Sequence, residues 1–371
     1  MSTMPVRLQR AAALAMLAAT VAACSGGASV AGAGSIGAAA QRSANQFLGR
    51  YVRPNGRVVR PDQSWDTVSE GQAYGMLLAE IAGRPAVFGR IWHWTRSHLQ
   101  LPDGLFAFHA NSAGQVLGQN PASDADVLIA WALLRYDAAH AAAMHRQGRR
   151  VAAAVLVHEV TAGPGRTPIL AAGPWGTGRP ASLNPSYWAL PALTGLGQLT
   201  GTRQWRRLAS GAVAMTVRLT RGGRELPPDW AVLTGRGKLA PSPSPDGTER
   251  QVEYGLAAQR TIPWFAFSCY PRAHALASRW WRLLRRPDRA RALALHPNGR
   301  PVNADPAPMS FVAAASAAQA AGQQTASHRL LDRAAAQQHR RPTYYGGAWT
   351  ALGLALFSGA LTSPCLAKSQ A

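Results

Sequence analysis

The feature that most constrains this sequence is a helical spacing of apolar residues that recurs along most of its length. Apolar residues return every three or four positions, as in Ala86, Phe88, Ile91, Trp92 and Trp94, and this spacing places them on one helix face. Sustained strand-like alternation is scarce, and no repeat of fixed sequence is visible. The pattern predicts an all-α fold of about twelve helices.

The predicted helices form pairs with short connections inside each pair and longer links between pairs. Their predicted ranges are Ala39–Tyr51, Ser69–Ala82, Pro85–Leu99, Asp124–Asp137, Ala139–Glu159, Pro185–Leu199, Arg203–Thr220, Arg250–Arg260, Pro271–Leu284, Pro308–Ala321, Ala326–Gln338 and Tyr344–Phe357. Long loops often carry binding or catalytic residues. The links that exceed the usual connection length are Leu101–Ala122, Ala162–Asn184, Gly222–Thr248 and Asn298–Ala307.

Length and charge exclude some classes of protein. The chain has 371 residues, enough for one large domain or two ordinary ones, and no break in composition after residue 40 marks a second domain. The formal net charge is +22, almost all of it from arginine. Because the arginines are scattered and accompany no zinc-finger, helix-turn-helix or RNA-binding motif, we predict no nucleic-acid partner.

The N-terminal residues have the features of a secretion signal. Arg7 and Arg10 precede the apolar run AAALAMLAATVAAC, which is too short to span a bilayer. The end of this run resembles a lipoprotein box in which Cys24 is lipidated; the alternative is ordinary cleavage near AGAGS. Residues 25–40 are read as a flexible tether. We therefore expect a periplasmic or extracellular protein, attached to the outer membrane only through a lipid on Cys24.

The sequence predicts neither a cofactor nor a metal site. No glycine-rich phosphate loop, metal-ligand histidine pair or Ser–His–Asp order is present, and His93, His98 and His109 are scattered. Cys269 and Cys365 could pair in an oxidising compartment, but two cysteines do not establish a bridge.

One acidic residue stands out at the start of an apolar helix. In the stretch TVSEGQAYGMLLAEIAG, Ser69 could cap the helix and Glu70 enters an apolar environment. A carboxylate there is costly unless it is paired, hydrogen-bonded or protonated. Glu70 therefore either favours the helix N-terminus electrostatically or is an acid kept protonated for catalysis.

A second acidic cluster opens the stretch NPASDADVLIAWALL. Asp124 and Asp126 stand one residue apart at the start of an apolar helix, where Ser123 or Asp124 could act as the cap. Helix initiation explains one of these acids and leaves the other free for another role. Since the whole chain has only 17 acidic residues, two such clusters favour a functional interpretation.

Aromatic residues near glycine and proline breaks suggest a site for sugars. Aromatic faces stack on the apolar faces of sugar rings, although core packing is the alternative for any single aromatic residue. The residues concerned are Trp175, Tyr187, Trp188, Trp230, Trp264 and Tyr345.

These motifs together resemble glycoside hydrolase family 8. TVSEGQAYGMLLA resembles the acid-bearing helix start of that family, and ASDADVLIAWALL resembles its signature. LNPSYW, LPPDW and YYGGAWTALGLALF match further family landmarks in the expected order. Within the family, the chain resembles the periplasmic endoglucanases that accompany bacterial cellulose synthases.

The resemblance implies a fold, an activity and a set of site residues. The fold would be an (α/α)6 barrel of six inner and six outer helices, with residues 41–358 as the catalytic domain and residues 359–371 as a tail. The activity would be that of an endo-β-1,4-glucanase, or cellulase, which hydrolyses β-1,4-glucan with inversion. Glu70 would be the proton donor, and Asp124 would be catalytic or would hold the distorted sugar at the cleavage point. The residues that would contact substrate or support the site are Asp126, Tyr187, Trp230 and Arg260.

The resemblance also implies partners. The glucan is the expected substrate, a cellulose synthase complex is the implied protein partner, and the chain is expected to be a monomer.

The sequence departs from the family pattern at the expected water-activating base. Cellulase-type members carry an aspartate in a GYDAIR-like stretch, whereas this chain has GLAAQR, with Ala257 at the place of the aspartate. An inverting enzyme needs a base about 6.5–9.5 Å from the acid. Asp246, Glu249 or Glu253 could supply it. The alternative is a weakened or inactive polysaccharide-binding lipoprotein built on the same barrel.

Overall fold

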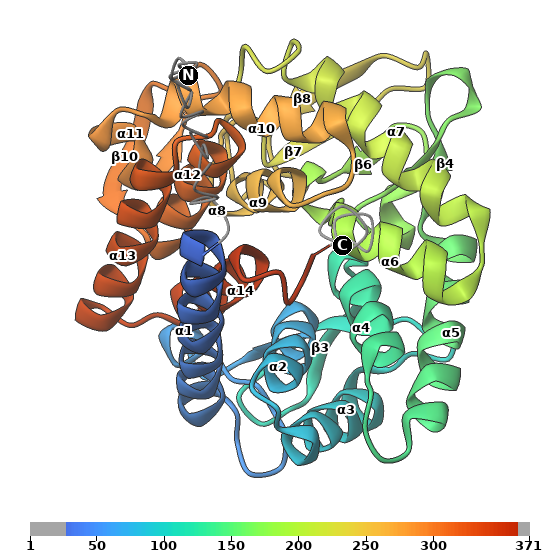
Figure 1. Cartoon of the computed structure of the whole chain (residues 1–371). Coiled ribbons are helices and arrows are strands. Elements are labelled where there is room, and N and C mark those ends of the chain that lie inside the picture. Colours follow the sequence, from blue (N-terminus) through green and yellow to red (C-terminus); the bar gives the residue numbers. More distant parts are fainter. Residues whose placement is uncertain (1–26, 363–371) are drawn as a thin grey trace, which may run out of the picture.

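The fold consists of helices arranged in two concentric rings, with short strands in the links between them (Figure 1). The computed structural model describes residues 27–362. The helices are α1 (Gly27–Tyr51), α2 (Ser69–Ile81), α3 (Pro85–Leu99), α4 (Ser123–Arg135), α5 (Ala141–His158), α6 (Leu190–Thr200), α7 (Arg203–Leu219), α8 (Leu256–Gln259), α9 (Thr261–Ala266), α10 (Pro271–Leu284), α11 (Pro287–Arg291), α12 (Pro308–Ala320), α13 (Gln324–Arg340) and α14 (Tyr344–Phe357).

The inner ring is formed by α2, α4, α6, α9, α12 and α14. Each contacts the next around the ring, and the contact of α14 with α2 closes it. Their residues are buried on nearly every side, because each inner helix has neighbours all round. The outer helices α1, α3, α5, α7, α10 and α13 each bury one face. This is an (α/α)6 barrel, as the family resemblance implied.

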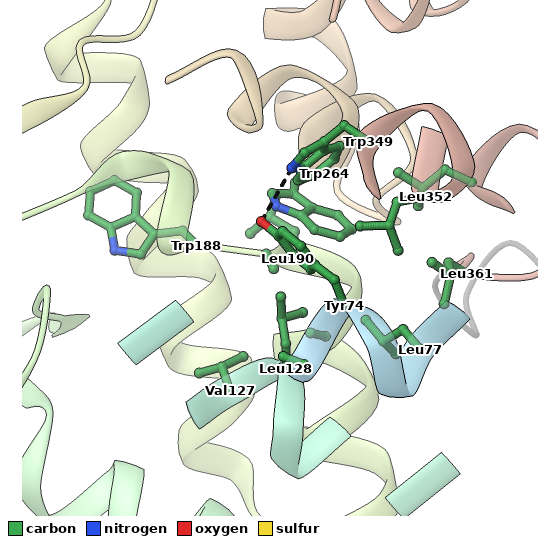
Figure 2. Packing of buried hydrophobic residues seen from close by; sticks show 14 of the residues in the cluster. Tyr74, Leu77, Val127, Leu128, Trp188, Leu190, Trp264, Trp349, Leu352 and Leu361 are labelled. Atoms are coloured by element: carbon green, nitrogen blue, oxygen red, sulfur yellow. Dashed lines mark hydrogen bonds between the residues drawn. The ribbon is translucent and has the colours of Figure 1, made fainter. Parts of the chain in front are cut away.

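Aromatic side chains fill the centre of the barrel. Trp264 on α9 and Trp349 on α14 pack edge to face, with ring centroids 5.2 Å apart. Both point toward Tyr74 on α2 in Figure 2, where the indole N–H of Trp349 donates to the phenol oxygen of Tyr74 at 3.3 Å. Residues far apart in the sequence are thereby joined across the ring.

Short antiparallel strands occupy the long links between the helix pairs. They are β1 (Thr67–Val68), β2 (Ala107–Ala110), β3 (Val116–Pro121), β4 (Val160–Ala162), β5 (Pro168–Leu170), β6 (Ala181–Leu183), β7 (Trp230–Leu233), β8 (Leu239–Ser242), β9 (Ala292–Leu295) and β10 (Pro301–Pro306). They form sheets β1-β2-β3, β6-β7-β8, β4-β5 and β9-β10. Their two to six residues are too short to show strand alternation in the sequence, which explains why they were not predicted.

These sheets lie where the chain passes from an outer to an inner helix. In register, Thr67 pairs with Ala110 and Val68 with His109, so β1 is held directly before α2. Strand β3 likewise precedes α4, and β10 precedes α12. The strands therefore fix the amino ends of inner helices, where Glu70 and Asp124 lie.

Two predicted helices differ from the observed elements. The segment predicted as a helix over Pro185–Leu199 begins with a 3-10 turn, Pro185–Tyr187, and α6 starts only at Leu190. Most of the segment predicted as a helix over Arg250–Arg260 is irregular, and only the short α8 forms there. The short helices α9 and α11 were missed because one or two turns give too little periodicity to detect.

The predicted tether and tail also need correction. Helix α1 begins at Gly27, so the described part of the predicted tether is helical. Alanine has the highest helix propensity, and the glycine and serine content of this stretch was misleading. At the other end, Leu361 is fully buried and lies near Leu77 in Figure 2, so the predicted tail begins inside the packed body.

Several predicted features lie outside the described residues. They include the signal segment, Cys24 and Cys365, so the lipid anchor and the pairing of Cys269 with Cys365 remain predictions. Between residues 27 and 362, no helix has both the length and the apolar composition that crossing a membrane requires.

Candidate active site

Arg260 is the centre of a buried polar cluster at the amino ends of the inner helices. Its Nη1 donates to Oε2 of Glu70 at 2.6 Å and to Oδ2 of Asp124 at 2.8 Å. The same nitrogen lies 3.0 Å from the phenol oxygen of Tyr74. Nη2 donates to the hydroxyl of Ser186 at 2.8 Å. The barrel thus brings together the predicted residues Glu70, Asp124 and Arg260.

The two carboxylates differ in exposure. The side chain of Glu70 is 22 % exposed, whereas those of Asp124 and Arg260 are 5 % and 4 % exposed. Substrate can therefore reach Glu70 more readily than it can reach Asp124. This difference suits Glu70 to direct chemistry and Asp124 to a supporting position.

The closeness of the two carboxylates favours retention of a proton. Because both oxygens bond one nitrogen, they are at most about 5.5 Å apart, below the spacing of about 6.5–9.5 Å for an inverting acid and base. Burial, together with the charge of Glu70, raises the pKa of Asp124 to about 7 against the opposing effect of Arg260. Near neutral pH, Asp124 therefore retains a proton for part of the time.

The start of α2 is fixed by side chains of its neighbours. Gln72 accepts the backbone N–H of Val58 at 2.6 Å and donates to the hydroxyl of Thr95 at 2.7 Å. Gly71 packs so tightly that a Cβ there would lie 2.6 Å from the phenol oxygen of Tyr344. Gly71 and Gln72 directly follow Glu70 and hold the first turn of α2 in place, which orients the carboxyl group of Glu70.

A network before α2 holds the preceding loop. Asp66 accepts hydrogen bonds from Arg60 at 2.7 and 2.6 Å and contacts Nε2 of His109 at 2.8 Å. Arg57 donates to the hydroxyl of Thr67 at 2.7 Å. These bonds connect the loop to β1 and β2, directly beside Glu70.

Ala257 lies in a segment that Asp229 holds in place. Asp229 is buried and accepts the backbone N–H groups of Gly255 and Ala258, both at 2.6 Å. Burial raises the pKa of Asp229 to about 7. The phenol of Tyr345 donates to the carbonyl of Leu256 at 3.0 Å. The position of the expected base is thus structurally fixed, but it carries only a methyl group.

Aromatic side chains from separate segments gather beside Arg260. The guanidinium carbon of Arg260 lies 5.3 Å from the ring centroid of Tyr187. The centroids of Tyr187 and Trp230 are 6.2 Å apart, and those of Trp230 and Trp175 are 6.4 Å apart. Trp175 is 43 % exposed. The predicted residues Tyr187 and Trp230 therefore adjoin the carboxylate cluster, and Trp175 extends the aromatic group outward.

Asp126, which was predicted to contact substrate or to support the site, is too deeply buried to contact substrate. Its side chain is fully buried, and Oδ1 accepts the backbone N–H of Phe106 at 2.9 Å. Successive residues of a helix point about 100° apart, so Asp126 faces away from the side that Asp124 presents. The surroundings of Asp126 are therefore those of a residue that holds the fold together.

The predictions from sequence missed several polar residues of the site and its surroundings. Tyr74 and Ser186 were visible within quoted motifs, and Asp229 is the acid of LPPDW. Nothing in the sequence marked Glu159 as part of the site except that it is an acid at the end of a predicted helix. Within residues 27–362, no group of three or more His, Cys, Asp or Glu residues is arranged to hold a metal ion.

Comparison with known proteins agrees with this arrangement. The family described as Glycosyl hydrolases family 8 matches residues 15–358. The fold and site define an (α/α)6 barrel with an acid–arginine cluster flanked by aromatic side chains. The chain belongs to glycosyl hydrolase family 8.

Individual relatives share parts of the sequence and the whole fold. An endoglucanase of Cellulomonas uda is 32% identical over 213 residues, or 55% of this chain, and a probable endoglucanase of Novacetimonas hansenii is 34% identical over 200 residues, or 52% of this chain. The alignments span 58% of each of these curated relatives. The structure of an endo-β-1,4-glucanase from Acetobacter xylinum superposes with a TM-score of 0.70 at 27% identity, covering 87% of this chain and 98% of that one.

The bridging role of Arg260 can be tested through stability. We expect Arg260→Met to lower the free energy of unfolding by about 3–5 kcal/mol, because it leaves two close carboxyl groups without their cation. Arg286→Met is the matched control, since Arg286 pairs with Asp288 at the surface, and it should leave the free energy of unfolding close to that of the wild type. Urea unfolding of both variants measures the difference; equal effects would contradict the assigned role.

Proposed function

We propose that this chain is an endo-β-1,4-glucanase that hydrolyses β-1,4-glucan with inversion at the anomeric carbon. The observation that carries the proposal is the partly exposed carboxyl of Glu70, which is bonded to Arg260 beside the buried Asp124. Membership of the family and the endoglucanase names of the relatives support the same activity. The neighbouring aromatic rings supply faces on which glucose units can stack.

In the proposed mechanism, Glu70 donates a proton to the glycosidic oxygen as the bond to the anomeric carbon breaks. Glu70 suits this role because it is the more exposed member of the carboxyl pair. Asp124 is too close to Glu70 to activate water on the opposite face of the sugar. We assign it to binding the distorted sugar ring, with Arg260 fixing both carboxyl groups.

The water-activating base is proposed to be Glu249. Ala257 cannot take a proton, so the base must come from another residue. Asp246 is exposed and bonded to Thr248, and Glu253 is engaged by Gln251. Glu249 is half-buried and has one buried carboxyl oxygen without a hydrogen-bond partner. Burial and the charges of Glu253 and Asp246 raise the pKa of Glu249, which makes it a stronger base.

The second candidate function is a polysaccharide-binding lipoprotein that does not cleave its ligand. Ala257 favours it, because the segment of the expected base is held in place by Asp229 and Tyr345 yet has no carboxylate. The aromatic group of Trp175, Tyr187 and Trp230 would serve binding equally well.

We further propose a location and partners. The signal features and Cys24 support a periplasmic or extracellular protein that a lipid holds at the outer membrane. Its substrate is the glucan, and a cellulose synthase complex is the proposed protein partner. The chain is proposed to act as a monomer.

The acid assignment is tested by Glu70→Gln. Glutamine preserves shape but cannot supply a proton, so turnover of carboxymethylcellulose should fall by about 10²–10⁴-fold. Glu80→Gln is the matched control, because Glu80 lies on the same helix and pairs with Arg135. This control should keep full turnover. Release of reducing ends is the measurement, and undiminished cleavage by Glu70→Gln would exclude Glu70 as the acid.

The base assignment is tested by Glu249→Gln. We expect a loss of about 10²-fold or more in turnover with unchanged glucan binding, while Glu253→Gln and Asp246→Asn remain active. Hydrolysis and affinity-gel retardation are measured on the same preparations. If Glu249→Gln cleaves normally, the assignment is wrong. If the wild type binds glucan but cleaves none, and Ala257→Asp creates cleavage, the binding-protein function replaces the hydrolase.

The lipid anchor is tested by Cys24→Ser. The wild type should partition into detergent and incorporate labelled fatty acid, and the variant should do neither, because serine lacks the thiol that accepts the lipid. Edman sequencing defines the mature N-terminus. A soluble wild type whose first residue lies after Cys24 would refute the anchor.

A further inference from the structure

Two carboxyl groups outside the proposed catalytic cluster are buried against each other. Asp126 belongs to the first turn of α4, and Glu159 directly follows α5. Both residues are 0 % exposed. The side chain of Glu159 lies within hydrogen-bonding reach of Asp126. Neither residue has a part in the proposed chemistry.

The surroundings of Asp126 and Glu159 supply almost no hydrogen-bond donors or positive charges that would stabilise two buried carboxylates. Asp126 Oδ1 accepts the N–H of Phe106, but among the described residues no donor reaches Asp126 Oδ2 or either carboxyl oxygen of Glu159. The other charges that act most strongly on the pair belong to Asp124 on α4 and Asp103 in the loop after α3, and both are negative. Two ionised carboxylates in this place would repel each other without a partner cation.

One proton resolves this conflict. A protonated Glu159 can donate its O–H to Asp126 Oδ2, which gives Asp126 Oδ2 and one of the two Glu159 carboxyl oxygens a partner. We propose that Glu159 is a positioning residue, which shares one proton with Asp126 and so locks the first turn of α4 to the end of α5. Through that turn it orients Asp124, a consequence that rests on the proposed hydrolase function.

Backbone bonds make this lock effective. The carbonyl of Glu159 accepts the N–H of Ala171 at 2.8 Å, and the carbonyl of Ala171 accepts the hydroxyl of Ser123 at 2.6 Å. Ser123 is the residue directly before Asp124. On the other side, Asp126 holds Phe106, the residue directly before β2. Opening the pair would therefore loosen both Asp124 and the strand that adjoins β1.

The proposal gives a definite sign for the effect of pH. Burial is the main cause that raises the pKa of both Asp126 and Glu159 in the folded chain. The folded state then keeps a proton that the unfolded state has released. The stabilisation is complete below about pH 4, near the unfolded carboxyl pKa, and is lost as pH rises through the folded pKa.

The test is Glu159→Gln, in which the amide donates to Asp126 at every pH. The wild-type folding equilibrium constant should fall, relative to that of the variant, by up to about tenfold per pH unit above pH 5. Urea unfolding midpoints from pH 5 to pH 9 measure this ratio. Glu225→Gln is the matched control, since it makes the same change of charge at a partly exposed residue, and it should retain the wild-type pH dependence.

The outcomes separate this inference from the proposed function. Parallel pH dependences for the wild type and Glu159→Gln would overturn the shared proton. If Glu159→Gln does not fold, Asp126→Asn, which keeps the acceptor for Phe106 and donates to Glu159, takes its place with the same expectation. The stability measurement needs no substrate, so a flattened pH dependence supports the shared proton even if the wild type cleaves no glucan. For an active wild type, Glu159→Gln should extend cleavage to higher pH; an unchanged alkaline limit would overturn the positioning of Asp124.

Discussion

The structure of the site depends on the burial of one guanidinium group between several inner helices. Arg260 follows α8, yet its hydrogen bonds reach Glu70 and Tyr74 on α2, Asp124 on α4 and Ser186 before α6. A charge that is 4 % exposed is tolerable only if most of its donors are satisfied by acceptors in good geometry. The planar fork of arginine can meet partners from several directions, which an ammonium group on lysine cannot do equally well. The amino ends of these helices must therefore converge, so one interaction couples closure of the ring to assembly of the site.

The parts of the fold and site that could be predicted from the sequence are those marked by a local pattern of residues. Glu70 and Asp124 could be found because each is an acid at the start of a long apolar helix, a local contrast that any reader of the sequence can see. Asp229 and Glu159 could not be assigned in the same way, because their partners, Gly255 and Asp126, come from distant segments and no local pattern marks the contact. The helices of both rings followed from periodicity, whereas β1 has two residues and α9 has six, too few for a period. The prediction for the alanine-rich residues 27–40 failed for another reason, because their composition suits both a linker and a helix.

In the segment around Ala257, the interactions that hold the backbone do not involve the side chain that would perform chemistry. Asp229 accepts N–H groups on both sides of Ala257, Tyr345 bonds the carbonyl before it, and Arg260 is anchored after it. None of these interactions uses the side chain at position 257. These bonds therefore hold the backbone around Ala257 whatever side chain that position carries. Retention of Glu70 and Asp124 is different, because both carboxylates compensate Arg260 and their removal would leave a buried cation unpaired.

The buried charges of the described chain explain why protons matter to both stability and function. The buried carboxyl groups are those of Asp124, Asp126, Glu159 and Asp229, and the buried cations are Arg57 and Arg260. Arg57 bonds Thr67 and backbone carbonyls, so Arg260 is the buried cation that faces carboxylates. The net charge of +22 does not change this balance, because the exposed arginines are solvated and screened. The interior at the amino ends of the inner helices therefore holds more carboxyl groups than it can keep ionised. Folding must retain protons there, and a barrel that retains protons beside a partly exposed carboxyl group is suited to general acid catalysis.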